Sequence, residues 1–414
     1  MSSAPDLKIN SRRLAESLTA LGQVGALAGG GVNRLALTDA DRLGRDWTVA
    51  RMRDLGMAVS IDAIGNVFAV YAGTEDLPPV MTGSHIDTVR TGGLYDGTYG
   101  VLAGLEVVAT LRDAGLRPRR PIAVAFFTNE EGARFQPDMM GSLVYVGGMP
   151  LAEALATRAT DGATVGEELQ RIGYNGPAAV AGPVVDSFVE LHIEQGPVLH
   201  QQGLQIGVVE GVQGISWTEF TLEGVSNHAG TTPMALRHDA GVVAVQIAAF
   251  VHALALRYGG RQLATVGAMQ LSPNLINVIA QRAVFTVDLR NTDEPTLARA
   301  ETEMHEFAAQ SAAAQGVSCS HRRLARFEPV AFDPLVISLI AQETQALGLS
   351  SLRLPSGAGH DAQMLARVCP TGMIFVPSVN GLSHNVNEFT APEDLAQGAQ
   401  VLLQVLMRLA QRGD

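Results

Sequence analysis

The chain has 414 residues, a formal net charge of −12 at pH 7 and a hydrophobic content of 47%. This length exceeds one ordinary compact core and predicts two domains with large buried interiors. The acidic balance argues against the basic face that nucleic acids and anionic membranes require, so we expect neither partner.

The first half of the chain predicts an α/β domain. We expect helices over residues 10–28 and 39–56, the second capped by Thr38 with acidic residues in its first turn. Apolar strand patterns then alternate with helical ones, as in a sheet covered by helices on both faces. The continuous apolar run before Thr128 is typical of a strand that is buried on both sides.

The pattern changes near Gly211, where strict alternation of apolar and polar residues begins. The order strand, helix, two strands, helix, strand predicts a small α+β sandwich, with a long helix over about 233–258. The first pattern then returns. We therefore predict an α/β catalytic domain, formed by 1–211 and 330–414, that is interrupted by an inserted domain, 212–329.

The remaining sequence features indicate a cytoplasmic protein. Cys319 and Cys369 make no disulfide framework, which fits a reducing compartment. The N-terminus lacks the continuous apolar core of a signal peptide. The apolar stretch 242–256 is broken by polar residues and is interpreted as a core helix, not as a membrane span.

Acidic and imidazole side chains follow four of the apolar strand patterns. They are His85 with Asp87, Glu130 with Glu131, His192 with Glu194, and His384, while Asp96 lies in the glycine-rich stretch "GGLYDGTYG". Functional groups in open α/β sheets collect at the carboxyl ends of strands. Three imidazoles with several carboxylates suit a pair of divalent ions such as zinc, because carboxylates can bridge and imidazoles can terminate. Adjacent carboxylates beside a buried strand also need a cation or a proton.

Eight motifs between about residues 60 and 390 resemble the hydantoinase/carbamoylase family of di-metal amidohydrolases, relatives of aminoacylases and dinuclear-zinc carboxypeptidases. They are "GSHIDTV", "GGLYDGTYGVLAGLEV", "TNEEGARF", "ELHIEQGPVL", "SNHAGTTPM", "NVIAQRAVFTVDLR", "GAGHDAQ" and "GLSHNVNE". "HIEQGP" and "GAGHDA" distinguish this branch from the peptidases, whereas "SHNVNE" lacks the proline that many members carry there. The resemblance implies a metallopeptidase-like catalytic domain with a mixed sheet and an inserted lid and dimerisation domain.

The resemblance also implies two divalent metal ions, with zinc, manganese, cobalt and nickel all suited to the ligands. The implied ligands are His85 and His192 for one ion, Glu131 and His384 for the other, and Asp96 as the bridge. Asp87 would hydrogen-bond His85 and fix its tautomer. Glu130 would be the general base that takes a proton from the water shared by the ions.

Five further residues match the substrate-binding positions of the family. His228 would donate to the oxyanion in the active site of the partner subunit, and Asn277 and Arg290 would clamp the substrate. The guanidinium fork of Arg290 suits the carboxylate of an amino-acid-like molecule. Gln195 and Gly359 would contact the substrate from the catalytic domain. Residues from two chains in one site imply a homodimer formed through the inserted domain.

The expected reaction is hydrolysis of the carbamoyl C–N bond of an N-carbamoyl-L-amino acid to the amino acid, CO2 and ammonia. Allantoate specialists carry an arginine where this chain has Trp217, which favours N-carbamoyl-L-amino acids over allantoate; β-ureidopropionate is a further alternative. The metal ligands alone do not distinguish an aminoacylase or peptidase. A decayed binding protein would lack a ligand or the base, but this sequence has all five ligand candidates and Glu130. A serine hydrolase would carry G-x-S-x-G, which this sequence lacks.

Overall fold

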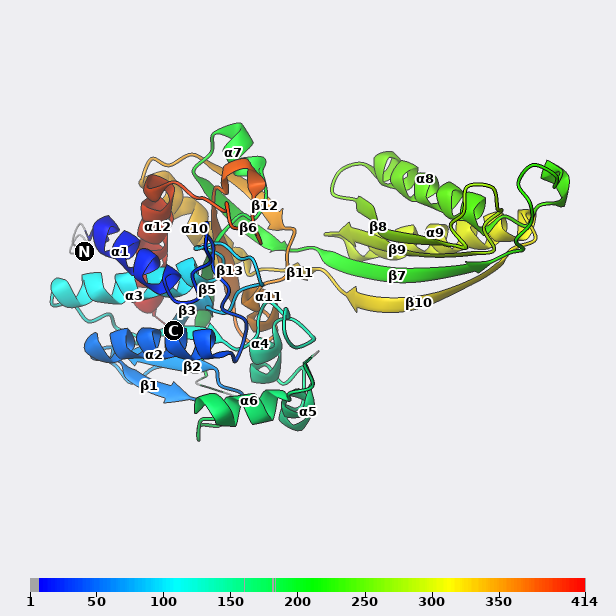
Figure 1. Cartoon of the computed structure of the whole chain (residues 1–414). Helices are drawn as coiled ribbons and strands as arrows, with labels where there is room; N and C mark the ends of the chain where they lie inside the picture. Colours follow the sequence, from blue (N-terminus) through cyan, green and yellow to red (C-terminus); the bar gives the residue numbers. More distant parts are fainter. Residues whose placement is uncertain (1–6, 160, 181, 183, 414) are drawn as a thin grey trace. The chain divides into compact units, whose positions relative to one another are not determined.

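The computed structural model describes residues 7–159, 161–180, 182 and 184–413, and the chain forms two compact units (Figure 1). Unit one consists of residues 1–211 and 331–414, and unit two of residues 212–330. The chain therefore leaves unit one once and returns to it once. Each unit has its own sheet, as expected for an α/β domain with an inserted α+β domain.

Unit one is built on a mixed nine-stranded sheet in the order β1-β2-β4-β3-β5-β13-β6-β11, with β12 paired to β6. Its strands are β1 (Ala58–Ile61), β2 (Val67–Tyr71), β3 (Val80–His85), β4 (Ile122–Phe127), β5 (Ser187–Ile193), β6 (Ile206–Val212), β11 (Val330–Ala331), β12 (Ser351–Ser356) and β13 (Thr371–Val376). The four central strands β4, β3, β5 and β13 run parallel. Their carboxyl ends therefore lie at one edge of the sheet, which is where an α/β sheet presents its functional groups.

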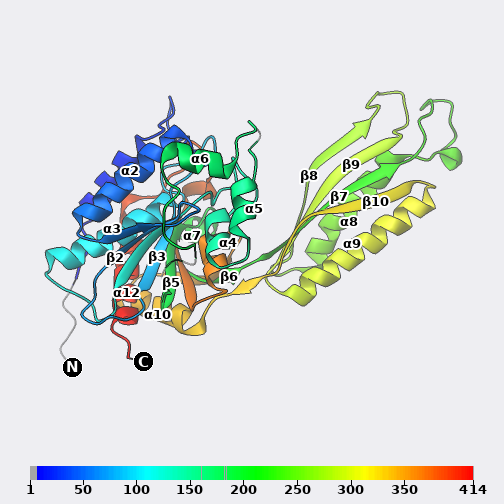
Figure 2. The ribbon, with the colours of Figure 1, turned by 90° about the horizontal axis from the view of Figure 1, so that it is seen from below.

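Helices cover both faces of this sheet (Figures 1 and 2). They are α1 (Ser11–Gly22), α2 (Asp39–Asp54), α3 (Thr98–Asp113), α4 (Met140–Tyr145), α5 (Leu151–Ala156), α6 (Val165–Ile172), α7 (Val198–Gln202), α10 (Pro334–Ala346), α11 (Asp361–Leu365), α12 (Pro392–Ala410) and the 3-10 turn η2 (Val379–Gly381). Helices α3, α10 and α12 pack together on one face, and α4 and α11 pack on the other. The central strands are consequently buried along their whole length, which explains their continuous apolar sequences.

Unit two is an antiparallel four-stranded sheet in the order β10-β7-β9-β8, packed against two helices. Its elements are β7 (Gly214–Glu223), the 3-10 turn η1 (Met234–Leu236), α8 (Ala240–Tyr258), β8 (Leu263–Ser272), β9 (Arg282–Asn291), α9 (Glu294–Ala314) and β10 (Ser318–Phe327). Alternate residues of β7 and β9 are buried against α8 and α9. Phe220 and Phe285 stack at the centre of this core, with ring centroids 5.2 Å apart.

Two predicted helix boundaries are wrong for local reasons. The first helix ends at Gly22 and not at residue 28, because Gly25 adopts a positive φ of 83° and its carbonyl accepts a hydrogen bond from Asn33. The long helix of unit two begins at residue 240 and not at 233, where Asp239 accepts hydrogen bonds from two backbone N–H groups of the first turn. Thr38 caps α2 as predicted.

Candidate metal centre

The carboxyl ends of the four parallel strands bring most of the predicted site residues together. His85 is the last residue of β3, and His192 lies next to the end of β5. Glu130 and Glu131 follow β4 after a two-residue turn, and His384 belongs to the loop after β13. Parallel pairing of these strands places residues that are far apart in sequence at a single edge of the sheet.

His85 and His192 form the first donor group, together with Asp96. Their donor atoms lie within 4.8 Å of one another, and all three residues are buried. His85 Nδ1 donates to the backbone carbonyl of Asp87 at 2.9 Å. His192 Nδ1 donates likewise to the carbonyl of Ile193 at 2.8 Å. With the proton on Nδ1, the neutral ring keeps a lone pair on Nε2, and in His192 this atom accepts from the backbone N–H of Gly97 at 3.0 Å. Nε2 lies 3.5 Å from Asp96 Oδ1 in His85 and 3.2 Å in His192.

His384 forms the second donor group with Glu131 and Asp96, again within 4.8 Å. His384 Nε2 lies 3.0 Å from Glu131 Oε2 and 3.5 Å from Asp96 Oδ2. The hydrogen bond to Glu131 raises the pKa of His384 to about 9. Asp96 thus directs Oδ1 to the first group and Oδ2 to the second, which is the arrangement that a carboxylate bridging two ions needs.

The donor set fits a pair of divalent cations. Burial opposes ionisation of Asp96, but the adjacent imidazoles of His192 and His85 hold the pKa of Asp96 well below its usual range. Glu131 Oε1 is buried and accepts no hydrogen bond within the described part of the chain, so its lone pairs are available to a cation. Gly97 keeps the site open, since a Cβ there would lie 2.3 Å from His85 Nε2.

Glu130 lies beside the first donor group. Its Oε2 is 3.3 Å from His85 Nε2, and 9% of its side chain is exposed. Burial raises the pKa of Glu130 well above its usual value. A carboxyl group with a raised pKa at the rim of a cation site can both take up and return a proton, which are the two acts of a general base that later serves as an acid.

Asp87 has a different contact from the one expected. The carbonyl of Asp87, and not its carboxylate, accepts the hydrogen bond from His85 Nδ1. The carboxylate instead accepts from the backbone N–H groups of Glu130 at 3.3 Å and Glu131 at 3.4 Å. Burial raises the pKa of Asp87 to about 6. The side chain therefore orients the segment that carries the predicted base, while the backbone orients the ligand.

Three polar residues around Asp96 complete the centre. Ser383 Oγ donates to Asp96 Oδ2 at 2.7 Å, and Gln195 Nε2 donates to the same oxygen at 2.9 Å. The buried carboxylate of Glu388 accepts from the backbone N–H groups of Tyr95 at 2.9 Å and Asp96 at 3.2 Å. Ser383 and Glu388 were not predicted as site residues. The available signal was an acid four residues after His384 in "SHNVNE".

Glu194 does not join the cluster although it follows β5. Its two carboxylate oxygens accept from the backbone N–H groups of Val198 at 2.9 Å and Leu199 at 2.8 Å. These are the unpaired donors at the start of the short helix α7. Glu194 is therefore a capping residue, which a position at a strand end does not reveal.

A third buried group consists of Glu190, His192 and His360, and it shares His192 with the first. The carboxylate of Glu190 accepts from Ser84 Oγ at 2.6 Å and from the backbone N–H of the second residue of α11 at 2.8 Å. The polar atoms of Glu190 are thus satisfied within the protein, which favours a supporting wall over a further ion site. Gly359 lies immediately before His360, in the turn between β12 and α11.

The predicted residues of unit two lie at two ends of its sheet. His228 and Asn277 are neighbours. His228 forms a β-bridge with Val278, and the carbonyl of Asn277 accepts from the backbone N–H of Ala229, the residue after His228, at 2.9 Å. Arg290 is eight residues along β9 from Arg282, about 27 Å at 3.4 Å per residue. Arg290 forms an ion pair with Asp288, with Nη2 to Oδ2 at 2.9 Å. Unit two therefore does not bring Arg290 together with the other two residues.

His228 is arranged as a hydrogen-bond donor. Its side chain is exposed, and its Nδ1 accepts from the backbone N–H of Gly230 at 3.0 Å. In the neutral ring the proton consequently resides on Nε2, which is then a hydrogen-bond donor on an exposed side chain. Trp217 lies on the sheet face opposite to the helices and is 40% exposed, so it is not part of the core of unit two.

The comparisons with known proteins agree with this geometry. Residues 81–408 match the model of "Peptidase family M20/M25/M40". Proteins of Rhizobium meliloti and Geobacillus stearothermophilus, both named as N-carbamoyl-L-amino-acid amidohydrolases, are 41% and 40% identical. These matches cover 98% and 97% of this chain, and 97% and 99% of the relatives.

A solved structure, the hydantoinase/carbamoylase family amidase of Burkholderia multivorans, superposes with a TM-score of 0.96 at 44% identity. It covers 99% of this chain and 100% of its own. The match extends over both units and confirms the predicted fold class. The chain belongs to the M20/M25/M40 peptidase family and, within it, to the hydantoinase/carbamoylase branch of metal-dependent amidohydrolases.

Proposed function

We propose that this chain hydrolyses the carbamoyl C–N bond of N-carbamoyl-L-amino acids to the free amino acid, CO2 and ammonia. The observation that carries the proposal is Asp96, whose two oxygens face two separate groups of imidazole and carboxylate donors with Glu130 alongside. The high identity to relatives named for this reaction supports the choice of substrate class.

We assign the metal ligands as the sequence predicts. His85 and His192 would hold one divalent ion, Glu131 and His384 the other, and Asp96 would bridge the two. Zinc suits this set, and manganese, cobalt and nickel suit it too. When bound, the ions would acidify a water shared between them and polarise the carbamoyl oxygen.

Glu130 would take the proton from the attacking water and return it to the nitrogen that leaves. Its position beside His85 and its raised pKa both support this role. Asp87 would keep the carboxylate of Glu130 in place through its hydrogen bonds to the backbone of Glu130 and Glu131. The order of events is attack on the carbamoyl carbon, collapse of the tetrahedral oxyanion and protonation of the amine.

Five residues would bind the substrate. We propose that Arg290 grips the amino-acid carboxylate with its guanidinium fork, which would require it to exchange its contact with Asp288. Gln195 and Gly359 would contact the substrate from unit one. The Nε2–H of His228, together with Asn277, would donate to the oxyanion.

The separation within unit two supports a site shared between two chains. Arg290 pairs with Ile215 near the start of β7, where the chain enters unit two from unit one. His228 and Asn277 lie at the opposite end of the sheet. In the proposed assembly, one chain would supply Arg290 to its own site, and a second copy would supply His228 and Asn277. We propose a homodimer formed through unit two on this basis.

The surface of unit two supports the same assembly. Strand β8 is an edge of the sheet and exposes Leu263 and Met269, and α8 exposes Val242, Val245 and Leu256. Helix α8 has the length and the apolar composition of a membrane-spanning helix, yet one of its faces packs on the sheet. An unpaired strand edge beside an apolar helix is suited to pairing with its own copy.

Since Cys319 and Cys369 are both free thiols, we expect this enzyme in the cytoplasm.

The test is product release by metal-depleted and reconstituted enzyme. The purified chain is treated with a chelator, then supplied with zinc, manganese or cobalt and assayed on N-carbamoyl-L-amino acids, allantoate, β-ureidopropionate and ureidoglycolate. We expect chelation to abolish turnover and an added metal ion to restore it on an N-carbamoyl-L-amino acid. Exposed Trp217 in place of an arginine leads us to expect weaker turnover of allantoate.

Restored turnover of acyl-amino acids or dipeptides, with no turnover of any ureido acid, would show an aminoacylase or peptidase instead. Turnover that survives complete metal removal would contradict the metal centre itself. Both results are read from the same set of samples, so the substrate class and the metal requirement are tested independently.

A further inference from the structure

Two arginines of the N-terminal segment are fully buried next to the metal centre without contacting any predicted ligand side chain. Arg34 is 1% exposed and Arg45 is 0% exposed, and they are among the largest fully buried side chains of the chain. Burying a guanidinium is costly unless its donors are all used, because the group remains charged inside a protein. Their contacts therefore indicate what the two charges stabilise.

Arg34 holds the end of β3. Its Nε donates at 2.7 Å to the carbonyl of Ile86, the residue between His85 and Asp87. Its Nη2 donates to Thr98 Oγ1 at 3.2 Å, at the start of α3 just after Asp96. Its Nη1 donates to two carbonyls at the end of α1, at 2.8 and 3.0 Å. One side chain thus links α1 to the segments that carry His85 and Asp96, two of the three residues of the first donor group.

The backbone of Arg34 reinforces this link. The carbonyl of Arg34 accepts from the backbone N–H of Thr88 at 3.0 Å, and its own N–H donates to Thr88 Oγ1 at 2.8 Å. Two residues earlier, Val32 exchanges backbone hydrogen bonds with Gly92 at 2.9 and 3.0 Å. Gly31 contacts the loop of the second donor group, where a Cβ would lie 2.7 Å from Val386 Cγ1. The segment 29–34 therefore lies against the loop after β3 and the loop after β13.

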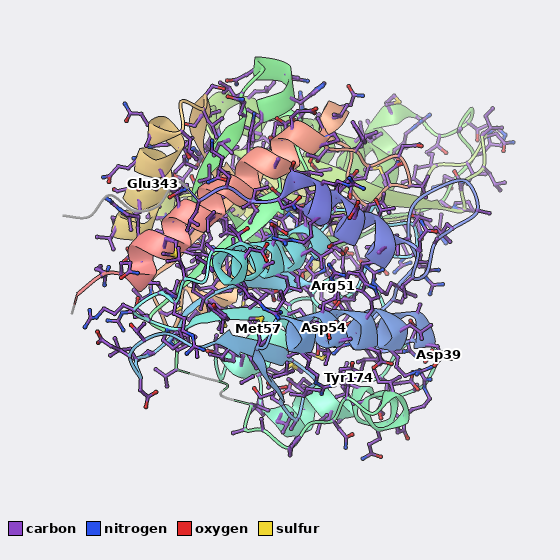
Figure 3. All side chains as sticks on the ribbon, turned by 90° about the vertical axis from the view of Figure 1, so that its left-hand side faces the viewer. Asp39, Arg51, Asp54, Met57, Tyr174 and Glu343 are labelled. Atoms are coloured by element: carbon purple, nitrogen blue, oxygen red, sulfur yellow. The ribbon has the colours of Figure 1, made fainter. Side chains whose placement is uncertain are left out.

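Arg45 performs the equivalent task at the end of β4. It lies in α2, whose first and last residues, Asp39 and Asp54, are labelled in Figure 3. Its Nη2 donates to Thr128 Oγ1 at 3.2 Å, two residues before Glu130, and its Nη1 donates to Gly65 O at 2.7 Å. Its Nε pairs with Asp41 at 2.8 Å. The guanidinium also lies 5.3 Å from the ring centre of Tyr174, which Figure 3 labels beside α2.

Asp87 connects the two arginines to the predicted base. Asp41 pairs with Arg45, and the negative charges of Asp41 and Asp87 also act on Arg34. Asp87 in turn accepts from the backbone N–H groups of Glu130 and Glu131. The hydrogen bonds of Arg34 and Arg45 thus join α1 and α2 to the ends of β3 and β4, whose spacing would set the positions of the residues that hold the ions.

We propose that Arg34 and Arg45 are positioning residues that set the spacing of the β3 and β4 ends, and thereby the affinity for the metal pair and the placement of Glu130. This inference rests on the metal centre of the proposed function. A guanidinium is required because each residue donates in several fixed directions at once, which the single ammonium of lysine does not reproduce.

The test compares Arg34→Lys and Arg45→Lys with a matched control, Arg13→Lys. Arg13 also bridges two helices, α1 and α3, through the buried carboxylate of Glu106 at 2.7 Å. Its side-chain hydrogen bonds go to α3 and not to the loops after β3 and β4. Metal affinity is measured by calorimetric titration of zinc or manganese into the chelated full-length protein. Thermal unfolding, kcat and KM at saturating metal are measured on the same preparations.

We expect Arg34→Lys and Arg45→Lys to bind metal about 10- to 100-fold more weakly, as is typical when the groups that orient ligands are changed. We also expect kcat at saturating metal to fall while KM stays within about threefold, because the base moves and the substrate clamp does not. Arg13→Lys should lower the unfolding temperature and change neither metal affinity nor kcat.

Metal affinity and kcat equal to those of the wild type in both lysine variants, with lowered unfolding temperatures, would overturn the inference and leave only a packing role. If Arg34→Lys does not fold, Thr88→Val removes one hydrogen bond of the same contact, and unchanged metal affinity in that variant overturns the role of Arg34. A wild-type chain that binds no divalent ion would overturn the metal centre of the proposed function, which is a distinguishable failure.

Discussion

Glu130 and Glu194 show how similar residues at one sheet edge acquire different roles. Both follow a buried central strand, and both are largely buried. Glu130 faces His85, whereas Glu194 turns to the first backbone N–H groups of α7. Both turns contain a residue of positive φ, but it precedes the acid after β4 (Asn129, 55°) and follows the acid after β5 (Gln195, 56°). A pattern of strand and acid predicts the first role but does not distinguish the second.

At this scale we expect Glu130→Gln to retain both metal ions and to lose about 10²- to 10⁴-fold in kcat, the usual contribution of a positioned proton-transfer group. Metal content and kcat are measured on the reconstituted enzyme. Glu194→Gln is the matched control and should keep kcat near the wild-type value, since it alters only a helix cap. Near-normal turnover in Glu130→Gln would show that another group takes the proton.

Contacts between distant residues explain why part of the site could not be predicted from the sequence. His85, Asp96, Glu131, His192 and His384 follow strand patterns or a glycine-rich loop, and the structure brings them together. Glu388 acts on the backbone of Asp96, 292 positions away, and Arg34 acts on the carbonyl of Ile86. Backbone donors and acceptors carry no signature of residue type, so such contacts appear only in three dimensions.

Among the elements, the two wrong boundaries have a common cause. The apolar content around residues 23–28 and 233–239 favours helix, but Gly25 and Asp239 form local hydrogen bonds that end or delay it. The parallel strands were predictable because burial on both faces leaves a continuous apolar run. Their order in the sheet was not predictable, since it depends on which distant strands pair.

Asp239 gives a prediction at this scale. It accepts from the N–H groups of Gly241 at 2.9 Å and Val242 at 3.2 Å, so Asp239→Ala leaves two donors of the first turn of α8 unpaired. We expect the free energy of unfolding of unit two to fall by about 1 kcal/mol, the usual value of an N-cap. Chemical denaturation followed by circular dichroism measures the change, and metal titration should be unaffected. A loss of metal affinity in this variant would contradict the separation of the two units.

In the whole molecule, the proposed assembly makes each active site depend on two chains. The proposed metal ligands and Glu130 belong to unit one, while His228 lies at the end of unit two that is remote from Arg290. Two variants that are each inactive can then compensate for one another, provided that their defects fall on residues supplied by different chains to the same site.

We expect a mixture of Glu130→Gln and His228→Ala chains, after subunit exchange, to recover about a quarter of wild-type activity, since half of the dimers would contain one intact site. A mixture of Glu130→Gln and Arg290→Ala serves as the control and should recover none. One chain supplies both residues to a site, so each site of the mixed dimer still carries one of the two defects. Activity is followed over time after mixing. No recovery in the first mixture would exclude donation of His228 across the dimer.

The two strands that connect unit two to the rest of the chain are paired with each other. Ile215 in β7 lies opposite Phe327 in β10, and paired residues of antiparallel strands are only about 5 Å apart at their Cα atoms. Excision of residues 216–326 would therefore leave two ends that a single short glycine linker could join, with every metal donor still in the chain. Such a deletion removes unit two and its proposed substrate-binding residues but keeps the proposed metal donors of unit one, so it would separate ion binding from turnover.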